Sequence, residues 1–319
     1  MASRLRRTLL AALVTAAVVF PVSAAAGPSA VPAPPPAALG PLDAAELPLL
    51  QARFAANRDN IREAARVAAD HGDRRRAASL DVMAAGGRQL LTFDGRDGGR
   101  TAEVFGDLAH ADRIALLVPG SDTNLDTYER FRAGAVALFD ATRAAGGGRT
   151  AVVAWLGYAT PGTVSTDVLT TGRADDAAGQ LRAFVREMKA ARPRAGLSLL
   201  CHSYGSVVCA RAAHGLDAAD IALYGSPGTG ADSVGELGTR ATVWAGRGRG
   251  DWIADVPHVR LELLGTDIGF GTDPVSDGFG ARVFDAGDGG HSDYLRPKTV
   301  SLDNLALIAA GRTGQVSGA

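Results

Sequence analysis

The sequence lacks several features that would define other classes of protein. Its 319 residues include 2 lysines beside 31 arginines, 2 cysteines and 6% aromatic residues. The net charge is −1 at pH 7, so nothing indicates a nucleic-acid partner. No group of histidine, cysteine or carboxylate residues has the spacing of metal ligands, and we expect neither a metal nor an organic cofactor.

Long apolar runs are missing after the first twenty residues. The N-terminus has a basic start, an apolar run and a small-residue cleavage site: Arg4, Arg6 and Arg7, residues 8–20, and Ala24 or Ala26. This order predicts a secretory signal peptide over 1–26, cleaved after either alanine, with an uncleaved anchor as the alternative. Its removal takes three arginines and no acid, which lowers the net charge to −4. We expect a secreted or cell-envelope protein, with no stable membrane span after cleavage.

Composition divides the remaining chain into three parts. Six of the fifteen prolines lie between Gly27 and Pro41, which predicts an extended linker over 27–42. Apolar residues then recur at helical spacing, which predicts an N-terminal helical segment over 43–86. No further linker or repeat follows, so the sequence predicts one large domain over 87–312, and we expect a monomer.

This domain alternates short apolar runs with longer amphipathic ones. The runs that predict strands are 89–93, 101–105, 113–118, 150–155, 197–201, 220–224, 241–245 and 282–285, and the main helical patterns are 125–145, 173–192, 207–213 and 300–310. The first two strands predict a hairpin that enters the sheet. The fold class is α/β, with a mostly parallel sheet of about eight strands and helices on both faces.

The central stretch Leu197 to Arg211 joins an apolar run, a turn of small residues and a second apolar run. It predicts a buried strand and then a helix, with Ser203 at the corner. At such a sharp turn the residues two before and two after the serine must be small, and here they are Cys201 and Gly205. The pattern predicts a nucleophile, although a serine that only begins a helix is an ordinary cap.

Two loops are candidates for the surroundings of this serine. The backbone N–H groups of Tyr204 and Ser121 are candidates for an oxyanion hole, because each follows a strand exit, although the loop of Ser121 also reads as an ordinary helix cap. In the loop after strand 150–155, the residues Trp155, Tyr158 and Leu169 read equally well as an acyl pocket and as an apolar cluster beneath the loop.

An acid and a base follow the serine in the chain. Asp251 comes after the strand at 241–245 and its Gly-rich exit, and Asp255 is the reserve candidate one helical turn further on. Of the six histidines, His291 follows a late strand in a Gly-rich loop. The order Ser203, Asp251, His291 is the nucleophile, acid, histidine order of α/β-hydrolases.

The cysteine pair leaves two interpretations open. Cys201 would end the strand and Cys209 would lie two turns into the following helix, so a disulfide would tie strand to helix behind the nucleophile. Two buried free thiols explain the sequence equally well.

Together these motifs resemble a known family, the actinobacterial α/β-hydrolases first catalogued as domain of unknown function 1023. The resemblance covers about 89–310, and its motifs are Leu90 to Asp94, Gly106 and Asp107, Val118 to Gly120, Trp155 to Tyr158, His202 to Ser206, Gly225 to Gly228 and His291. It implies that Ser203 is the nucleophile, His291 the base and Asp251 the acid. Cys201 departs from the glycine of the family's usual elbow.

We therefore expect a secreted serine hydrolase that cleaves a small-molecule or lipid carboxylic ester through an acyl-enzyme intermediate. Two alternatives stay open at this point. The same triad would serve an acyltransferase that passes the acyl group to an alcohol, and the fold would also serve a non-catalytic envelope-binding module.

Overall fold

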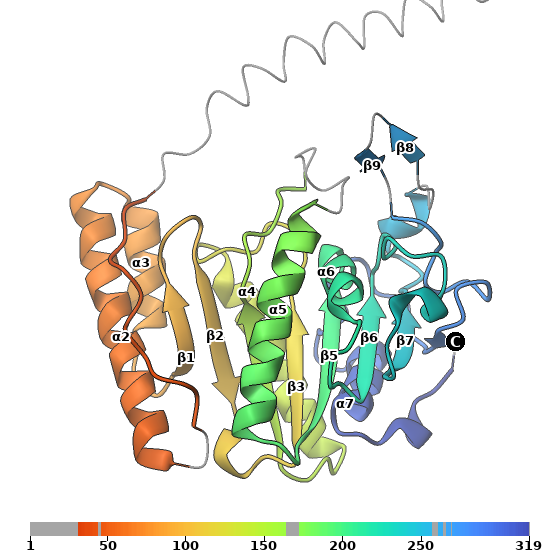
Figure 1. Cartoon of the computed structure of the whole chain (residues 1–319), viewed down its shortest axis with the longest axis horizontal. Coiled ribbons are helices and arrows are strands. Elements are labelled where there is room, and N and C mark those ends of the chain that lie inside the picture. The colour runs from red at the N-terminus through yellow and green to blue at the C-terminus, as the bar shows by residue number, and fades with distance from the viewer. Residues whose placement is uncertain are drawn as a thin grey trace, which may run out of the picture. The chain divides into compact units, whose positions relative to one another are not determined.

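The computed structural model describes residues 31–43, 46–163, 172–256, 261–263, 266–268 and 270–318. The predicted signal peptide and Leu169 lie outside the described residues. One compact unit spans Pro32–Ala319, so it begins inside the segment predicted to be a linker. The reason is that this segment lies against helix α2 (Leu47–Asp70) (Figure 1), where Asn60 donates a hydrogen bond to the Pro35 carbonyl at 2.8 Å.

The described helices and strands follow one another in an α/β order. The helices after α2 are α3 (Arg74–Met83), α4 (Tyr128–Ala144), α5 (Gly172–Ala191), α6 (Tyr204–Ala212) and α7 (Val300–Ala309). The strands are β1 (Gln89–Asp94), β2 (Arg100–Phe105), β3 (Arg113–Val118), β4 (Thr150–Leu156), β5 (Gly196–His202), β6 (Asp220–Tyr224), β7 (Thr242–Gly246), β8 (Leu261–Leu263), β9 (Thr266–Ile268) and β10 (Arg282–Val283).

Eight of these strands form one sheet in the order β1-β2-β4-β3-β5-β6-β7-β10. β1 and β2 are antiparallel, β2 pairs antiparallel with β4, and the strands from β4 to β10 are parallel. β3, β4 and β6 are built largely of Val, Leu, Ile and Ala because both of their faces are buried, as is usual for parallel strands. β5 lies in the middle of this sheet, so the residue after it emerges at the centre of the sheet's carboxyl edge.

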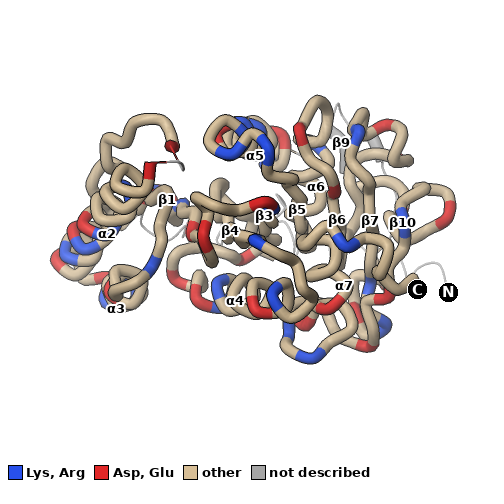
Figure 2. The backbone as a smooth tube through the Cα atoms, turned by 90° about the horizontal axis from the view of Figure 1, so that it is seen from below, with Lys and Arg blue, Asp and Glu red and all other residues tan. Residues whose placement is uncertain are grey.

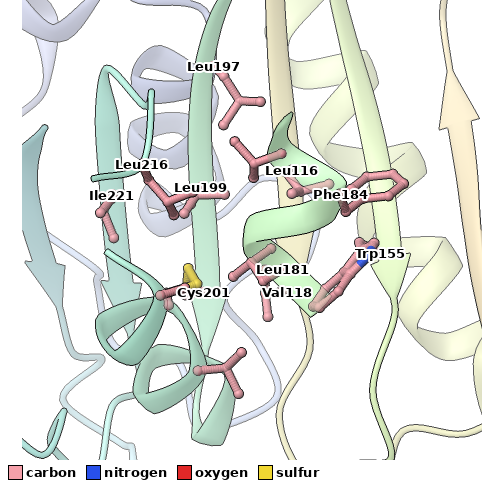
Figure 3. Close-up of a cluster of buried hydrophobic side chains, with 14 of the residues drawn as sticks. Leu116, Val118, Trp155, Leu181, Phe184, Leu197, Leu199, Cys201, Leu216 and Ile221 are labelled. Carbon is pink, nitrogen blue, oxygen red and sulfur yellow. A yellow bond between two sulfur atoms is a disulfide. The ribbon is translucent and has the colours of Figure 1, made fainter. Parts of the chain in front are cut away.

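Helices cover both faces of the sheet (Figures 1 and 2), with α5 and α6 on one face and α4 and α7 on the other. Each face has its own hydrophobic core. Leu181, Phe184 and Val207 belong to the first core, part of which is drawn in Figure 3, and Leu138 and Leu305 belong to the second. Among the described residues, no helix is both long and apolar enough to cross a membrane.

Helix α2 closes the β1 edge of the sheet. Its side chains Asn57 and Arg53 are buried and donate hydrogen bonds to the carbonyls of Leu90 and Leu91, at 2.8 and 3.3 Å. An uncovered edge strand would offer its polar groups to other chains. The N-terminal helical segment therefore completes the sheet instead of standing apart from it.

The predicted fold class is confirmed, including the antiparallel hairpin that leads into the sheet. Strand β10 is shorter than the predicted 282–285, and two helices begin about one turn away from their predicted starts. Helix α4 begins at Tyr128 and not near Leu125, because the Thr127 hydroxyl bonds backbone groups of the preceding loop, including the Asn124 N–H at 3.0 Å. Helix α6 begins at Tyr204, so the corner is a single residue. The short β8–β9 hairpin was not predicted.

Candidate active site

Ser203 occupies a strained corner between β5 and α6. Its backbone angles are φ 52° and ψ −127°, in a region that residues with side chains rarely adopt. The Ser203 N–H donates to the Tyr224 carbonyl at 3.0 Å, which ties the corner to the end of β6. Such strain at a strand-to-helix corner exposes the hydroxyl above the sheet, as in a nucleophile elbow.

Two glycines allow the backbone around this corner to pack closely. A Cβ on Gly205 would lie 2.5 Å from the Pro119 carbonyl oxygen and 2.6 Å from that of Val118. A Cβ on Gly120 would lie 2.7 Å from the Cβ of Ser203. The exit of β3 therefore lies directly beside the serine, and side chains at either position would force the two apart.

The structure brings Ser203, His291 and Asp251 into one chain of contacts. His291 Nε2 lies 2.9 Å from Ser203 Oγ, and His291 Nδ1 lies 2.9 and 3.1 Å from the two carboxylate oxygens of Asp251. Since a carboxylate only accepts hydrogen bonds, Nδ1 carries the proton and Nε2 presents its lone pair to the serine hydroxyl. Asp255, the reserve acid, is exposed in the short turn Trp252–Asp255.

The Asp251 carboxylate is enclosed and accepts two further hydrogen bonds. The Ile253 N–H donates to Oδ1 at 2.9 Å and the Tyr294 hydroxyl donates to Oδ2 at 2.5 Å. Burial alone would raise the pKa of Asp251, but the hydrogen bonds from His291, Tyr294 and Ile253 outweigh it and hold the pKa below its ordinary value. Asp251 is thus an ionised partner for His291.

Tyr294 is itself held in place. Its hydroxyl accepts a hydrogen bond from the Gly248 N–H at 3.0 Å while it donates to Asp251. Burial and the neighbouring carboxylate raise the pKa of Tyr294 far above its usual value, so the phenol keeps its proton. Tyr294 therefore links the β7 exit loop to the acid.

His202 contacts both the backbone and the ring of His291. Its Nε2 lies 2.8 Å from the His291 carbonyl oxygen, so this nitrogen carries a proton and donates. Its ring centroid lies 5.2 Å from that of Tyr224 and 4.8 Å from that of His291. Burial, and then the nearby His291 ring, lower the pKa of His202 to about 4, so His202 is neutral at pH 7.

The backbone N–H groups in the loop after β3 differ in whether they have a hydrogen-bond acceptor. The N–H groups of Asp122, Thr123 and Asn124 donate to the Pro161 carbonyl, the Thr160 hydroxyl and the Thr127 hydroxyl. Within the described residues the Ser121 N–H has no such acceptor. Tyr204, the other candidate, is the first residue of α6. Both groups therefore lie in segments that adjoin Ser203.

A cavity of about 680 Å³ opens over Ser203 and His291. Its walls are mostly apolar, and most of the lining residues come from the loop after β3, the face of α4, the turn after Asp251 and the loop that follows His291. Tyr224, Pro227 and Phe270 also line it. At its mouth Trp252 is 51% exposed, and its ring centroid lies 4.7 Å from that of His291. A largely apolar cavity with a few convergent polar groups is typical of a small-molecule site.

Comparison with known proteins identifies the family of this chain. Residues 94–261 match the family model described as alpha/beta hydrolase. The chain belongs to the α/β-hydrolase family. It is 31% identical over 255 residues to an uncharacterized protein of Mycobacterium tuberculosis, which covers 69% of this chain and 38% of that protein. It thus matches less than half the length of that relative. An uncharacterized protein of Mycobacterium bovis is 31% identical over 187 residues, covering 53% of this chain and 70% of that protein.

Solved structures of α/β hydrolases are also similar to this one. A protein of Xanthomonas campestris, described as an a/b serine hydrolase without lid, is 20% identical, with a TM-score of 0.46, over 72% of this chain and 95% of its own. A Pyrococcus furiosus esterase is 12% identical, with a TM-score of 0.45, over 72% of this chain and 92% of its own.

Of the two interpretations of Trp155 and Tyr158, the structure contradicts the substrate pocket and agrees with the apolar cluster beneath the loop. Both side chains are buried in the core shared with α5 and do not line the cavity above Ser203 (Figure 3 labels Trp155 beside Phe184). The Tyr158 hydroxyl donates to the Pro119 carbonyl at 2.6 Å. Tyr158 therefore supports the loop that carries Gly120 and Ser121, and Trp155 is a packing residue.

Cys201 and Cys209 are joined by a disulfide, with their Cα atoms 6.4 Å apart. Both residues are fully buried. The bond links the end of β5 to the middle of α6, on either side of the serine corner. A residue larger than glycine at position 201 is accommodated because its side chain points into the core of the α5 and α6 face.

Sequence reasoning missed three supporting residues of this hydrolase site: His202, Tyr294 and Gly225. Gly225 has φ 57°, and a Cβ there would lie 2.9 Å from the Tyr294 ring and 3.1 Å from Asp251 Oδ2. His202 and Gly225 belong to the motifs of the family resemblance, which assigned them no role, and Tyr294 lies three residues after His291.

Proposed function

We propose that this α/β hydrolase cleaves carboxylic esters with Ser203 as nucleophile, His291 as general base and Asp251 as the orienting acid. The observation that carries the proposal is the unbroken chain from Ser203 Oγ to His291 Nε2 at 2.9 Å and from His291 Nδ1 to Asp251 at 2.9 Å. The strained backbone of Ser203 supports the same role, because strain of this kind persists where surrounding structure and function require it.

The reaction begins when Ser203 Oγ attacks the ester carbonyl carbon and His291 Nε2 takes the hydroxyl proton. The imidazolium then gives that proton to the departing alcohol, which leaves an acyl group on Ser203. Water attacks the acyl carbon, His291 takes its proton, and the carboxylic acid leaves as the serine is restored. Asp251 stabilises the imidazolium in both halves of the reaction.

The N–H groups of Tyr204 and Ser121 form the oxyanion hole in this proposal. Tyr204 N–H lies at the start of α6, where the helix dipole favours negative charge. Ser121 follows Gly120, whose missing side chain lets the β3 loop approach Ser203 Oγ. Donors aimed at the developing oxyanion are worth a factor of about 10² to 10³ each in rate.

Within the family, we place this chain among the actinobacterial hydrolases catalogued as domain of unknown function 1023. The motifs quoted above support this placement, as does the similarity to mycobacterial proteins. We also propose that the protein is exported. The basic, apolar and small-residue pattern over residues 1–26 supports export, and so does a buried disulfide, which persists in oxidising compartments.

The test is hydrolysis of a short-chain nitrophenyl ester by the chain without residues 1–26. Ser203→Ala should lower kcat by several powers of ten with the fold intact, because a small hydroxyl is removed. Ser233→Ala, which lies outside the cavity, is the matched control and should retain wild-type activity. The product should be the free acid even with added alcohol. Activity above a few per cent in Ser203→Ala would show that another residue is the nucleophile.

A further inference from the structure

One wall of the cavity is a single face of helix α4. Thr127, Arg130, Phe131 and Gly134 line it, at the spacing of three and four residues that places side chains on one face. The loop after His291 forms the adjoining wall through Leu295, Arg296 and Pro297. The two walls touch at Gly134, where a Cβ would lie 2.9 Å from Leu295 Cδ1. Each wall thus has an arginine next to this contact: Arg130 one turn before Gly134, and Arg296 directly after Leu295.

These two arginines have no acidic partner within the described residues, although carboxylates are close in the sequence. Beside Arg130, Asp126 pairs with Arg76 at 2.5 Å and Glu129 pairs with Arg88 at 2.7 Å. Beside Arg296, Asp293 accepts the Gly290 N–H at 2.9 Å.

Among the described residues that line the cavity, Asp122 is the one with an acidic side chain, and its carboxylate is hydrogen-bonded to Thr163. Its carboxylate accepts the Thr163 N–H at 3.2 Å and also the Thr163 hydroxyl. These neighbouring carboxylates are ion-paired or hydrogen-bonded to other groups, while two exposed arginines, Arg130 and Arg296, line a cavity that is otherwise largely apolar.

We propose that the substrates of this site are esters that also carry an anionic group, such as a carboxylate or phosphate, which Arg130 and Arg296 bind. This inference rests on the proposed function, because it names the substrate class of the same site. The apolar walls hold the chain between the ester and the anion. Guanidinium groups suit this task because they remain charged and offer several donors to an oxyanion.

The test uses nitrophenyl esters of succinate, adipate and suberate, whose far end is either a free carboxylate or its methyl ester. The two members of each pair differ in the charge and in one methyl group at that end, and the uncatalysed rate of each ester is subtracted. At the best chain length, kcat/KM should favour the anionic member by about tenfold, the size expected for two partly exposed ion pairs, and added salt should reduce this preference. The double variant Arg130→Gln/Arg296→Gln should lose it. Arg186→Gln, on α5 at the opposite face of the sheet, is the matched control and should keep it.

A binding measurement makes the test independent of turnover. In the Ser203→Ala background, monomethyl and dimethyl suberate are titrated while the fluorescence of Trp252 at the cavity mouth is followed. The anionic ligand should bind about tenfold more tightly, and the double arginine variant should remove the difference. Equal binding, or a preference that survives the double variant, overturns the anion site. If wild type cleaves neutral and anionic esters equally and Ser203→Ala cleaves neither, the substrate class is wrong while the proposed hydrolase stands.

Discussion

His202 offers the most quantitative prediction, because its protonation should control acid stability. In the folded protein the ring is enclosed by Tyr224, His291 and Tyr294, and its pKa is lowered from 6.5 to about 4. In the unfolded chain the pKa returns to its ordinary value. Between these two values the unfolded state binds more protons, so the free energy of unfolding rises with pH and falls as the solution is acidified.

The magnitude follows from the two pKa values. Linkage with pKa values of 6.5 and about 4 gives a loss of about 2 kcal/mol in the free energy of unfolding between pH 7.5 and pH 5. His202→Gln removes this titration and retains an amide N–H that can donate to the His291 carbonyl. The variant should therefore lose about 2 kcal/mol less stability than wild type over the same interval.

Urea unfolding at pH 7.5 and pH 5, followed by circular dichroism, measures the effect. His214→Gln is the matched control, because His214 is exposed, and its pH dependence should follow wild type. The reasoning is refuted if wild type and His202→Gln lose equal stability on acidification. The same result would mean that the folded protein accepts a proton on His202 as readily as the unfolded chain does.

Three further predictions concern the acid, its tyrosine and the cysteines. Asp251→Asn should lower kcat by about 10³ to 10⁴, because an amide cannot stabilise the imidazolium, whereas Asp255→Asn should cost little; the reverse result on the same ester would move the acid by one helical turn. Tyr294→Phe removes a hydrogen bond that lowers the pKa of Asp251, so Asp251 becomes more basic and stabilises the protonated form of its partner His291 more strongly. The acidic limb of the pH profile of kcat/KM should therefore move to higher pH. If the limb does not move, Tyr294 serves only in packing. Intact mass after alkylation without reductant should show no modified thiol, and two alkylated cysteines would rule out the disulfide between Cys201 and Cys209.

The fold could be predicted from the sequence because its signals are local. Each buried strand is a short apolar run between turn residues, and the helices have amphipathic spacing. The corner at Ser203 was also predictable, since it needs a strand, a helix and small flanking residues in immediate succession. Asp251 and His291 could be placed because parallel strands bring the loops after them to one edge of the sheet.

The contacts that complete the site depend on tertiary packing. Tyr294 reaches Asp251 across 43 residues of chain, and His202 reaches the His291 carbonyl across 89. No local pattern specifies these distances or angles. The assignment of Trp155 and Tyr158 to the substrate pocket failed for a similar reason. An aromatic residue after a strand can face either the cavity or the core, and Trp155 turned towards Phe184 because α5 packs on that face.

The central claim is that Ser203 is the nucleophile, and covalent labelling tests it most directly. The chain without residues 1–26 is incubated with a fluorophosphonate that reacts with activated serines, and its intact mass and peptide map are recorded. We predict one adduct, on Ser203, that is lost in Ser203→Ala and strongly slowed in His291→Ala, because the hydroxyl needs the imidazole 2.9 Å away to accept its proton. An adduct that persists in Ser203→Ala, or a wild-type protein that is never labelled, would contradict the account.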